Sequence, residues 1–456
     1  MRPSKSYEAT PMKEIDSRVL ETFETSFDKD PKNSLAMNAV TESGISPVAL
    51  SRGDANRINY TFSHQVNAPE VTNQEKSGRC WLFSGLSFLA IEAMKKLNVK
   101  TFELSQIYQM FFDKLEKANY FLENIIETRD EPVGSRIVMW LLADPIPDGG
   151  QWHMFVNLID KYGVVPKSFM QETKNSNDTR PMNTFLEMKL REYAKKLRDM
   201  YAGNDDLEAL YSMKENFIEE FYRMLVIFLG KPPADIYWGW RDKDEKFHRH
   251  GRMTPKEFYD EYIGLDLDSY VCLINAPTMD KPFDRTFTVK HLGNVIGGRP
   301  ILYLNVDMKT LRNATVDMIK DDHAVWFGCD VGQMLARDLG AMDLRVYDYD
   351  LVFGTGLNLE KASRLDYGCS KMTHAMLLAG VDLDESGSPL KWRVENSWGT
   401  KVGDKGFMCM TDEWFEQYLY EVAVDRKYLA PELLKALEAK PIALEPWDPM
   451  GSLARS

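Results

Sequence analysis

The chain changes the period of its apolar residues along its length, and this change constrains the fold more than any other feature. Between residues 80 and 127 the apolar residues recur at helical spacing, whereas short apolar runs typical of strands cluster after about residue 269. Helices first and strands last predict an α+β protein with a helical lobe and a sheet lobe. The strand candidates are Tyr270–Ile274, Ile301–Val306, Val325–Cys329, Ala375–Val381, Trp392–Glu395 and Phe407–Met410.

Three helices are predicted in the first third of the chain. Residues 12–27 are amphipathic, with apolar side chains at helical spacing. A second helix begins at or just before Cys80 and is apolar almost all round, which predicts that it is buried. Ser105 is placed to cap a third helix over residues 106–127.

The middle and the end of the chain follow different patterns. Residues 175–265 are charged, aromatic and largely helical, with few strand signals, and we interpret them as an insertion. Pro431 starts a short helix that Pro441 ends. The apolar tail beyond it holds several prolines and a glycine, so it is expected to be extended and to dock on the protein. The chain is therefore divided into five predicted segments. They are an N-terminal helix with its lead-in (1–60), a helical lobe (61–174), a helical insertion (175–268), a sheet lobe (269–430) and a C-terminal helix with an extended arm (431–456).

Composition excludes several classes of protein. A length of 456 residues exceeds one ordinary core, so two or more lobes, or one domain with a large insertion, are expected. The net charge of -13 argues against general binding to nucleic acid or to anionic membranes. No apolar run approaches the roughly 20 residues that span a bilayer, and no secretory signal is recognisable.

The cysteines indicate a cytoplasmic protein. Their number is five, and none belongs to a C-x-x-C pair, which disfavours both a disulfide framework and a zinc site. His248 and His250 lie in a charged stretch and are interpreted as surface residues, so neither a metal nor a cofactor is expected. Four of the cysteines are interpreted as small buried apolar residues, and the exception is Cys80.

Cys80 has the surroundings that thiolate chemistry requires. It follows Gly78 at the start of a helix, where the helix dipole and the free backbone N–H groups favour the thiolate. The string Gln74-Glu75-Lys76-Ser77-Gly78-Arg79-Cys80-Trp81 resembles the nucleophile segment of papain-like cysteine peptidases. The resemblance implies that Gln74 lends its amide to the oxyanion hole. Ser77 replaces the first cysteine of the family's local signature, which agrees with a reducing environment.

Two histidines compete for the role of base, His323 and His374, and both precede apolar strand-like runs. The papain family pairs its histidine with an asparagine on a following strand, and Asn396-Ser397-Trp398-Gly399 is similar to that motif. Asn396 lies 22 residues after His374 and 73 after His323. A simple hairpin brings only the nearer pair together, so His374 is the predicted base. The resemblance implies that Asn396 orients its ring and that Trp398 shields their bond from water.

A glycine pair offers a candidate substrate contact. Gly149 and Gly150 precede Gln151-Trp152, and in the resemblance such a pair places bare backbone beside a bound peptide. Their other interpretation is a plain turn before a helix. Cys80 and His374 are 294 residues apart, against about 130–150 in papain and the cathepsins, which agrees with a large insertion.

The whole pattern, with Met372-Thr373-His374-Ala375-Met376 and the tail Pro446-Trp447-Asp448-Pro449-Met450-Gly451-Ser452-Leu453-Ala454, resembles the bleomycin hydrolase and bacterial aminopeptidase C family. The resemblance implies a homohexamer with internal active sites, activity on peptides with a free N-terminus, and possible hydrolysis of bleomycin-like amides. It also implies a tail that blocks one side of the cleft and presents the carboxylate of Ala454 to the substrate's α-amino group. Arg455 and Ser456 follow that residue, either as foreign residues or as a removable extension.

Two alternatives remain at this point. The same scaffold is an endopeptidase if the tail does not cap the cleft. From another class, the chain is a nucleic-acid-binding assembly protein, for which the basic residues Lys189, Arg191, Lys195, Lys196 and Arg198 are candidates. Many acidic residues share those helices, so they are interpreted as solvated faces.

Overall fold

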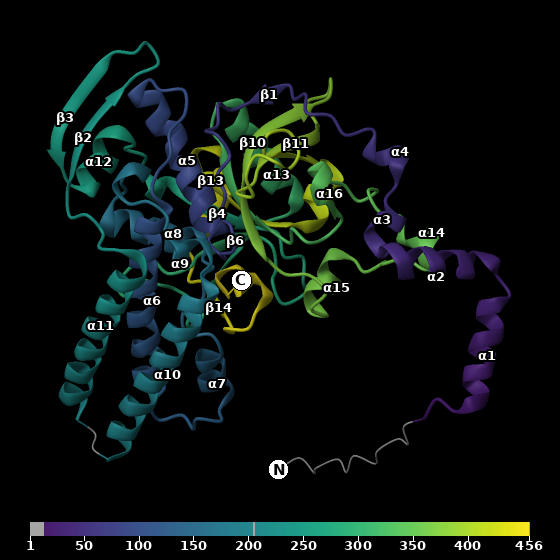
Figure 1. Ribbon diagram of the computed structural model, residues 1–456, viewed down its shortest axis with the longest axis horizontal. Helices are drawn as coiled ribbons and strands as arrows, with labels where there is room; N and C mark the ends of the chain where they lie inside the picture. Colours follow the sequence, from purple (N-terminus) through teal and green to yellow (C-terminus); the bar gives the residue numbers. More distant parts are fainter. Residues whose placement is uncertain (1–12, 204–205, 456) are drawn as a thin grey trace. The chain divides into compact units, whose positions relative to one another are not determined.

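The computed structural model describes residues 13–203 and 206–455, and these form two compact units. The smaller unit combines the described part of Met1–Asn56 with Arg345–Asn358, and the larger unit holds Arg57–Leu344 and Leu359–Ser456. Figure 1 labels many of their helices and strands. The candidate site residues predicted from the sequence all belong to the larger unit.

The smaller unit is helical. The predicted N-terminal helix is present from Ser17, where Asp16 caps it, but none of its residues is buried. Asp348 donates its backbone N–H to the carbonyl of Ala49 at 2.8 Å, which ties the returning segment to the N-terminal helices. The helices are α1 Ser17–Asp28, α2 Pro31–Ser43, α3 Ile45–Ala49, α4 Arg52–Ala55 and α14 Tyr349–Phe353.

The larger unit has a helical side built around α5, as Figure 1 shows. Helix α5 (Cys80–Leu97) is buried on almost every face and packs on α6 and α8. The hydroxyl oxygen of Ser105 accepts the backbone N–H of Tyr108, so the predicted cap of α6 is confirmed. The other helices on this side are α6 Gln106–Glu127, α7 Arg136–Ala143, α8 Trp152–Tyr162, α9 Lys174–Asn177, α10 Arg180–Gly203, α11 Leu207–Leu229 and α12 Pro255–Tyr262.

The middle segment contains strands that the sequence did not reveal. Helices α10 and α11 pack on α6, but they are followed by an antiparallel hairpin of β2 (Ile236–Arg241) and β3 (Phe247–Met253). Its aromatic face is covered by α12, with Trp238 against Tyr262. The hairpin was missed because β3 is rich in Arg and His and mostly exposed, so it lacks the alternation of a half-buried strand.

A long mixed sheet forms the other side of the larger unit. In the described chain its strand order is β14-β5-β6-β4-β13-β7-β10-β11-β12-β9-β8, and β1 pairs with β10. All six predicted strands are present within three residues of their expected limits, the largest difference being the start of β11 at Pro389. The strands are β1 His64–Gln65, β4 Tyr270–Ile274, β5 Arg285–Val289, β6 Tyr303–Asn305, β7 Val325–Cys329, β8 Leu335–Ala336, β9 Ala341–Met342, β10 His374–Leu383, β11 Pro389–Glu395, β12 Phe407–Thr411, β13 Leu419–Asp425 and β14 Ile442–Leu444.

The remaining α-helices alternate with the strands along the second half of the chain. They are α13 Met308–Lys320, α15 Lys361–Asp366, α16 Asp412–Tyr418 and α17 Pro431–Ala436. Helix α17 begins at Pro431, as predicted. Among the described helices none combines the length and the apolar character needed to cross a bilayer.

The C-terminal tail docks on the protein, but the expectation that it is extended throughout is wrong. Residues Ile442–Leu444 extend the sheet as β14, parallel to β5. Pro449–Arg455 then coils into a 3-10 helix. A proline at the first position of a helix loses no hydrogen bond, because that N–H has no partner within the helix. The prolines therefore restrict where the coil begins and do not prevent it.

Candidate active site

Cys80 is the first residue of α5 and is buried. Gly78 before it donates its backbone N–H to Asp148 Oδ2 at 3.0 Å. Arg79, between them, is also buried and donates through Nη1 to Glu172 at 3.1 Å and through Nη2 to the carbonyl of Ser176 at 2.8 Å. This arginine anchors the turn that presents the thiol, a role that sequence reasoning missed.

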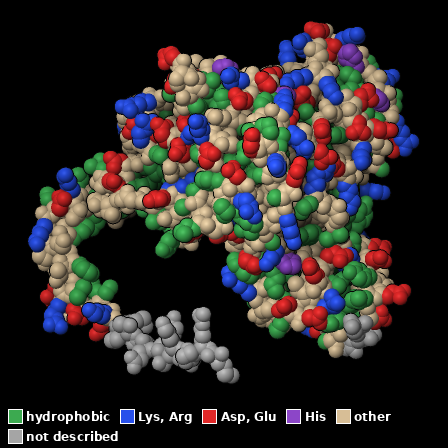
Figure 2. Space-filling view, turned by 180° about the vertical axis from the view of Figure 1, so that it is seen from behind, with side chains coloured by type: hydrophobic (Ala, Val, Ile, Leu, Met, Phe, Trp, Pro, Cys, Tyr) green, Lys and Arg blue, Asp and Glu red, His purple; other side chains and the backbone are tan. Residues whose placement is uncertain are grey.

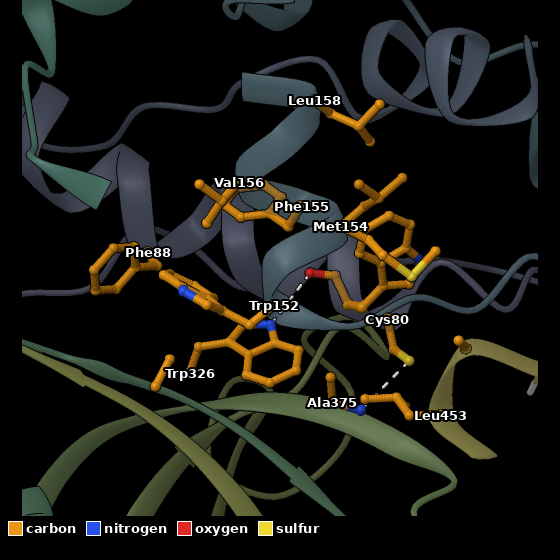
Figure 3. Packing of buried hydrophobic residues seen from close by; sticks show 14 of the residues in the cluster. Cys80, Phe88, Trp152, Met154, Phe155, Val156, Leu158, Trp326, Ala375 and Leu453 are labelled. Carbon is orange, nitrogen blue, oxygen red and sulfur yellow. Dashed lines mark hydrogen bonds between the residues drawn. The ribbon is translucent and has the colours of Figure 1, made fainter. Parts of the chain in front are cut away.

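The thiol of Cys80 lies against the strand that carries the predicted base. The backbone N–H of Ala375 donates to its Sγ at 3.4 Å, and Figure 3 shows this bond. Burial raises the pKa of Cys80 to about 11, although the backbone N–H groups of Ala375, Trp81 and Cys80 act in the opposite direction. The predicted donors are therefore present, but the expected lowering of the pKa is wrong in this enclosed state because burial outweighs them.

His374 and Asn396 are brought together by the β10–β11 hairpin. His374 begins β10, Asn396 follows β11, and Nε2 of the histidine lies 2.9 Å from Oδ1 of the asparagine. Burial lowers the pKa of His374 to about 4, the Asn396 bond raises it, and the charge of Arg337 lowers it further. His323 lies elsewhere, 3.9 Å from Glu92.

Trp398 and Gln74 complete the neighbourhood that the sequence predicts. The Trp398 ring lies 5.2 Å from the His374 ring, centroid to centroid. Gln74 accepts the hydroxyl of Ser397 at 2.8 Å and donates through Nε2 to the carbonyl of Ser77 at 2.5 Å. Its amide is thus held between the nucleophile segment and the asparagine segment.

The glycine pair packs directly under the nucleophile helix. A Cβ on Gly150 would stand 2.4 Å from the Trp81 ring, so only glycine fits there. Lys117, buried in α6, donates to the carbonyl of Gly149 at 2.6 Å. Lys114, also buried, donates to the carbonyl of Ile146 at 2.8 Å and pairs with Asp148 at 2.7 Å.

These buried lysines were missed by sequence reasoning, although a signal for one of them exists. Lys114 falls on the helical stripe that Ile107, Phe111, Ala118 and Phe121 define, so its position faces the core. Burial acts to raise the pKa of Asp148, but Lys114 and two neighbouring hydrogen-bond donors hold it well below its usual range. The loop is therefore fixed by charge as well as by packing.

The C-terminal arm, residues 445–455, reaches the same place. Figure 3 shows Leu453 beside Cys80 and Ala375, and Leu453 and Ala454 are both buried. The carbonyl of Met450 accepts from Gln151 Nε2 at 3.4 Å, and the hydroxyl of Ser452 donates to the carbonyl of Met372 at 2.7 Å. The arm thus contacts both the glycine loop and the segment before the base.

The other cysteines differ in their exposure to solvent. All five cysteines lie among the described residues and are free. Cys272, Cys329 and Cys409 are buried, but Cys369 is exposed, so the interpretation of Cys369 as a buried residue is wrong. The described residues contain no group of three or more His, Cys, Asp or Glu side chains placed to hold a metal ion.

Comparison with known proteins gives consistent matches along the chain. The model of the Peptidase C1-like family matches residues 14–451. Aminopeptidase C of Listeria monocytogenes serovar 1/2a is 45% identical over 441 residues, which cover 97% of this chain and 99% of that protein. Bleomycin hydrolase of Homo sapiens is 43% identical over 434 residues, which cover 93% of this chain and 95% of that protein.

A solved structure agrees with the fold as well. The crystal structure of PepW from Lactobacillus rhamnosis HN001 matches with a TM-score of 0.94 at 43% identity, covering 96% of this chain and 99% of that one. The predicted resemblance, the papain-like α+β fold and the class of thiol peptidase are therefore confirmed. The chain belongs to the Peptidase C1-like family of cysteine peptidases.

Proposed function

We propose that this protein is an aminopeptidase that removes N-terminal residues from peptides through an acyl-enzyme on Cys80. The observation that carries the proposal is the position of Leu453 beside Cys80, with Leu453 and Ala454 both buried. An arm in that position closes one side of the cleft close to the thiol. Only a short acyl portion then fits between the thiol and the end of the arm.

The chemistry follows from the groups around the thiol. His374 takes the proton of Cys80, and the thiolate attacks the carbonyl carbon of the scissile amide. The second N–H of the Gln74 amide and the backbone N–H of Cys80 are suited to bind the resulting oxyanion. His374 then protonates the leaving amine, and it later takes a proton from the water that releases the acid. Asn396 holds the tautomer in which Nδ1 can accept the thiol proton.

We also propose that the arm selects for free N-termini, with Ala454 as its working end. A carboxylate near a bound α-ammonium is stabilising only where water is partly excluded, and the arm is buried there. Arg455 follows Ala454 and is held by the ring of Trp140 at 3.9 Å and by Asp144 at 3.7 Å. With Arg455 present, the terminal carboxylate lies beyond Ala454 and not on it.

The test compares an aminoacyl fluorogenic substrate with its N-acetylated form, on three proteins. These are the full chain, a chain ending at Ala454 and a chain ending at Met450. Trimming to Ala454 is expected to raise cleavage of the free-amine substrate. Ending at Met450 is expected to open the cleft and to permit cleavage of the blocked substrate. The same preference in all three proteins would remove the arm as the specificity element.

We further propose a location, an assembly state, an inserted segment and a second class of substrates for this protein. A cytoplasmic location agrees with five free cysteines. A homohexamer agrees with the exposed apolar residues on the inserted helices and the hairpin, among them Met188, Ile227 and Tyr237. We also propose residues 175–268 as an insertion in the peptidase fold, and bleomycin-like amides as possible substrates.

The two alternatives are separated by simple observations. Cleavage of the blocked substrate by the full chain would favour the endopeptidase. Binding of nucleic acid that weakens steeply with salt would favour the assembly protein. Against the latter, Lys189 and Lys196 both pair with Glu192, and Arg191 pairs with Glu187, so these cations are already neutralised locally. Figure 2 shows basic and acidic side chains interspersed over the face that it presents.

A further inference from the structure

An arginine lies next to the predicted base without a carboxylate partner. The guanidinium of Arg337 lies 4.3 Å from the centre of the Trp398 ring, and the same ring lies 5.2 Å from that of His374. Arg337 is exposed and Trp398 is half-buried. Among the described residues no Asp or Glu forms an ion pair with Arg337, whereas Arg79, beside the nucleophile, pairs with Glu172.

The surrounding fold fixes the backbone position of Arg337. It begins a short 3-10 turn, residues 337–339, between β8 and β9. The hydroxyl of Tyr60 donates to the carbonyl of Leu339 at 2.7 Å. Gly340 ends the turn at φ +61°, where a Cβ would stand 2.5 Å from the Cα of Gly403. The turn is therefore held against two other segments of the larger unit, those that contain Tyr60 and Gly403.

The direction of the reaction decides which part of a substrate meets this cation. The arm contacts Gln151 and Met372, and in the proposed aminopeptidase it occupies the acyl side of the cleft. His374 has to protonate the leaving amine, so the leaving portion lies against the imidazole and its neighbour Trp398. An exposed guanidinium over that indole is therefore presented to the leaving portion.

We propose that Arg337 recognises a carboxylate on the leaving portion of the substrate. The carboxylate is either the side chain of an Asp or Glu that follows the scissile bond or the free α-carboxylate of a one-residue leaving group. Guanidinium binds carboxylates in a bidentate manner, and stacking on Trp398 preorganises its plane. In a chain of net charge -13, one local cation offsets the general repulsion of acidic peptides. This inference rests on the proposed aminopeptidase function.

The test uses three dipeptides that share the same free N-terminal alanine. They are Ala-Gln amide as the neutral reference, Ala-Glu amide for the side-chain carboxylate, and Ala-Gln with a free C-terminus for the α-carboxylate. Release of alanine gives kcat/KM for each, and the readout is the ratio of each acidic substrate to the neutral one. Arg337→Gln is expected to lower at least one of these ratios by about fivefold. The ratio that falls identifies the source of the carboxylate.

Three further variants make the result specific. Arg337→Lys keeps the charge and should restore part of the lost ratio. Arg337→Glu should invert it and favour Ala-Lys amide. The matched control is Arg249→Gln, because Arg249 is also exposed and also stacks on an aromatic ring, Phe247, but lies on β3. It should keep the wild-type ratios, and raised salt should diminish them in the wild type.

Two outcomes would overturn the inference. One is a loss in Arg337→Gln that is equal for the neutral and the acidic dipeptides, since it means that the residue only supports Trp398. The other is unchanged ratios for both acidic dipeptides. Failure of the proposed function has a different signature. Cleavage of N-acetylated dipeptides as fast as free ones refutes the aminopeptidase, while the ratios still report on Arg337.

Discussion

At the scale of single residues, the site is defined by a thiol and an imidazole that are both enclosed. Burial raises the pKa of Cys80 to about 11 and lowers the pKa of His374 to about 4. Both shifts favour the uncharged pair, because a low-dielectric environment penalises each charged form. In this enclosed state, proton transfer from the thiol to the imidazole is therefore unfavourable.

Substitutions of the base and of its partner should differ in severity. His374→Ala removes the proposed general base and is expected to abolish nearly all turnover. Asn396→Ala removes only the bond of 2.9 Å that orients the ring, so a smaller loss is expected. Steady-state kcat/KM on a free aminoacyl substrate measures both. Equal inactivation by His323→Ala, with an unaltered circular dichroism spectrum, would contradict the assignment.

Glu395, next to Asn396, provides a prediction about pH. It is buried, with Ser87 as its hydrogen-bond donor at 3.4 Å, and burial raises its pKa to about 8. A folded pKa above the unfolded value of 4.5 means that the native state holds the proton more tightly. The contribution to stability is complete below pH 4.5 and is lost as pH rises from 4.5 to 8.

Glu395→Gln keeps the shape of the side chain but cannot ionise. Its melting temperature should therefore exceed that of the wild type increasingly between pH 5 and 8. The corresponding difference in the free energy of unfolding should grow by at most about 1.4 kcal/mol per pH unit. Thermal melts at several pH values measure this difference. A difference that is constant with pH, or largest at pH 5, would show that Glu395 is ionised in the native protein.

At the scale of elements, the C-terminal arm is held in place close to the candidate site. Leu453 lies beside Cys80, and the ring of Trp447 is fixed by the guanidinium of Arg136 at 3.6 Å. Further along, Lys281 pairs with Asp448 at 2.9 Å. The arm is thus anchored upstream of Gly451, so its last residues can be removed without releasing the rest.

Ending the chain at Met450 should change the reactivity of Cys80 as well as the substrate preference. Removal of Leu453 exposes the thiol to water, and each unit by which its pKa falls raises the thiolate fraction about tenfold at neutral pH. Alkylation by iodoacetamide, followed by mass spectrometry, measures the rate. Cys369 is exposed in the full chain and serves as the internal reference. An unchanged ratio of Cys80 to Cys369 labelling would mean that the arm does not enclose the thiol.

At the scale of the whole molecule, apolar side chains remain uncovered in the described chain. Ile227 of α11 is 75% exposed and Met188 of α10 is 64% exposed, although both helices pack on α6 through their other faces. In the smaller unit, Phe23 of α1 is 56% exposed. Large exposed apolar side chains on several elements are typical of surfaces that are buried by assembly.

The proposed homohexamer is tested by mass. Light scattering should give about six times the 52.5 kDa of the chain at micromolar concentration. Ile227→Glu and Met188→Glu should weaken the assembly, because a charge in an apolar contact is costly to desolvate. The control is Glu219→Gln, because Glu219 is exposed and lies on α11, the helix that also carries Ile227. A monodisperse monomer of the unaltered chain would refute the assembly.

The parts of the protein that follow from local pattern could be predicted from the sequence. Cys80 was found from a glycine turn before an apolar helix, and His374 was paired with Asn396 because a hairpin joins residues that are close along the chain. The Ser105 cap and the strand Tyr270–Ile274 depend on neighbouring residues in the same way. Each of these features is encoded within about 25 residues.

Other features depend on what the fold packs against a segment, so only the tertiary structure decided them. The charged strand Phe247–Met253 is a strand because β2 pairs with it. Lys114 is buried because the 146–149 loop offers its carbonyls and Asp148, and the tail coils at Pro449 where Tyr303 and Gln151 meet the carbonyl of Met450. The direction of the Cys80 pKa shift is of this kind too. Burial is a property of the surroundings, and for Cys80 these come from β10 and from the arm, almost 300 residues or more away along the chain.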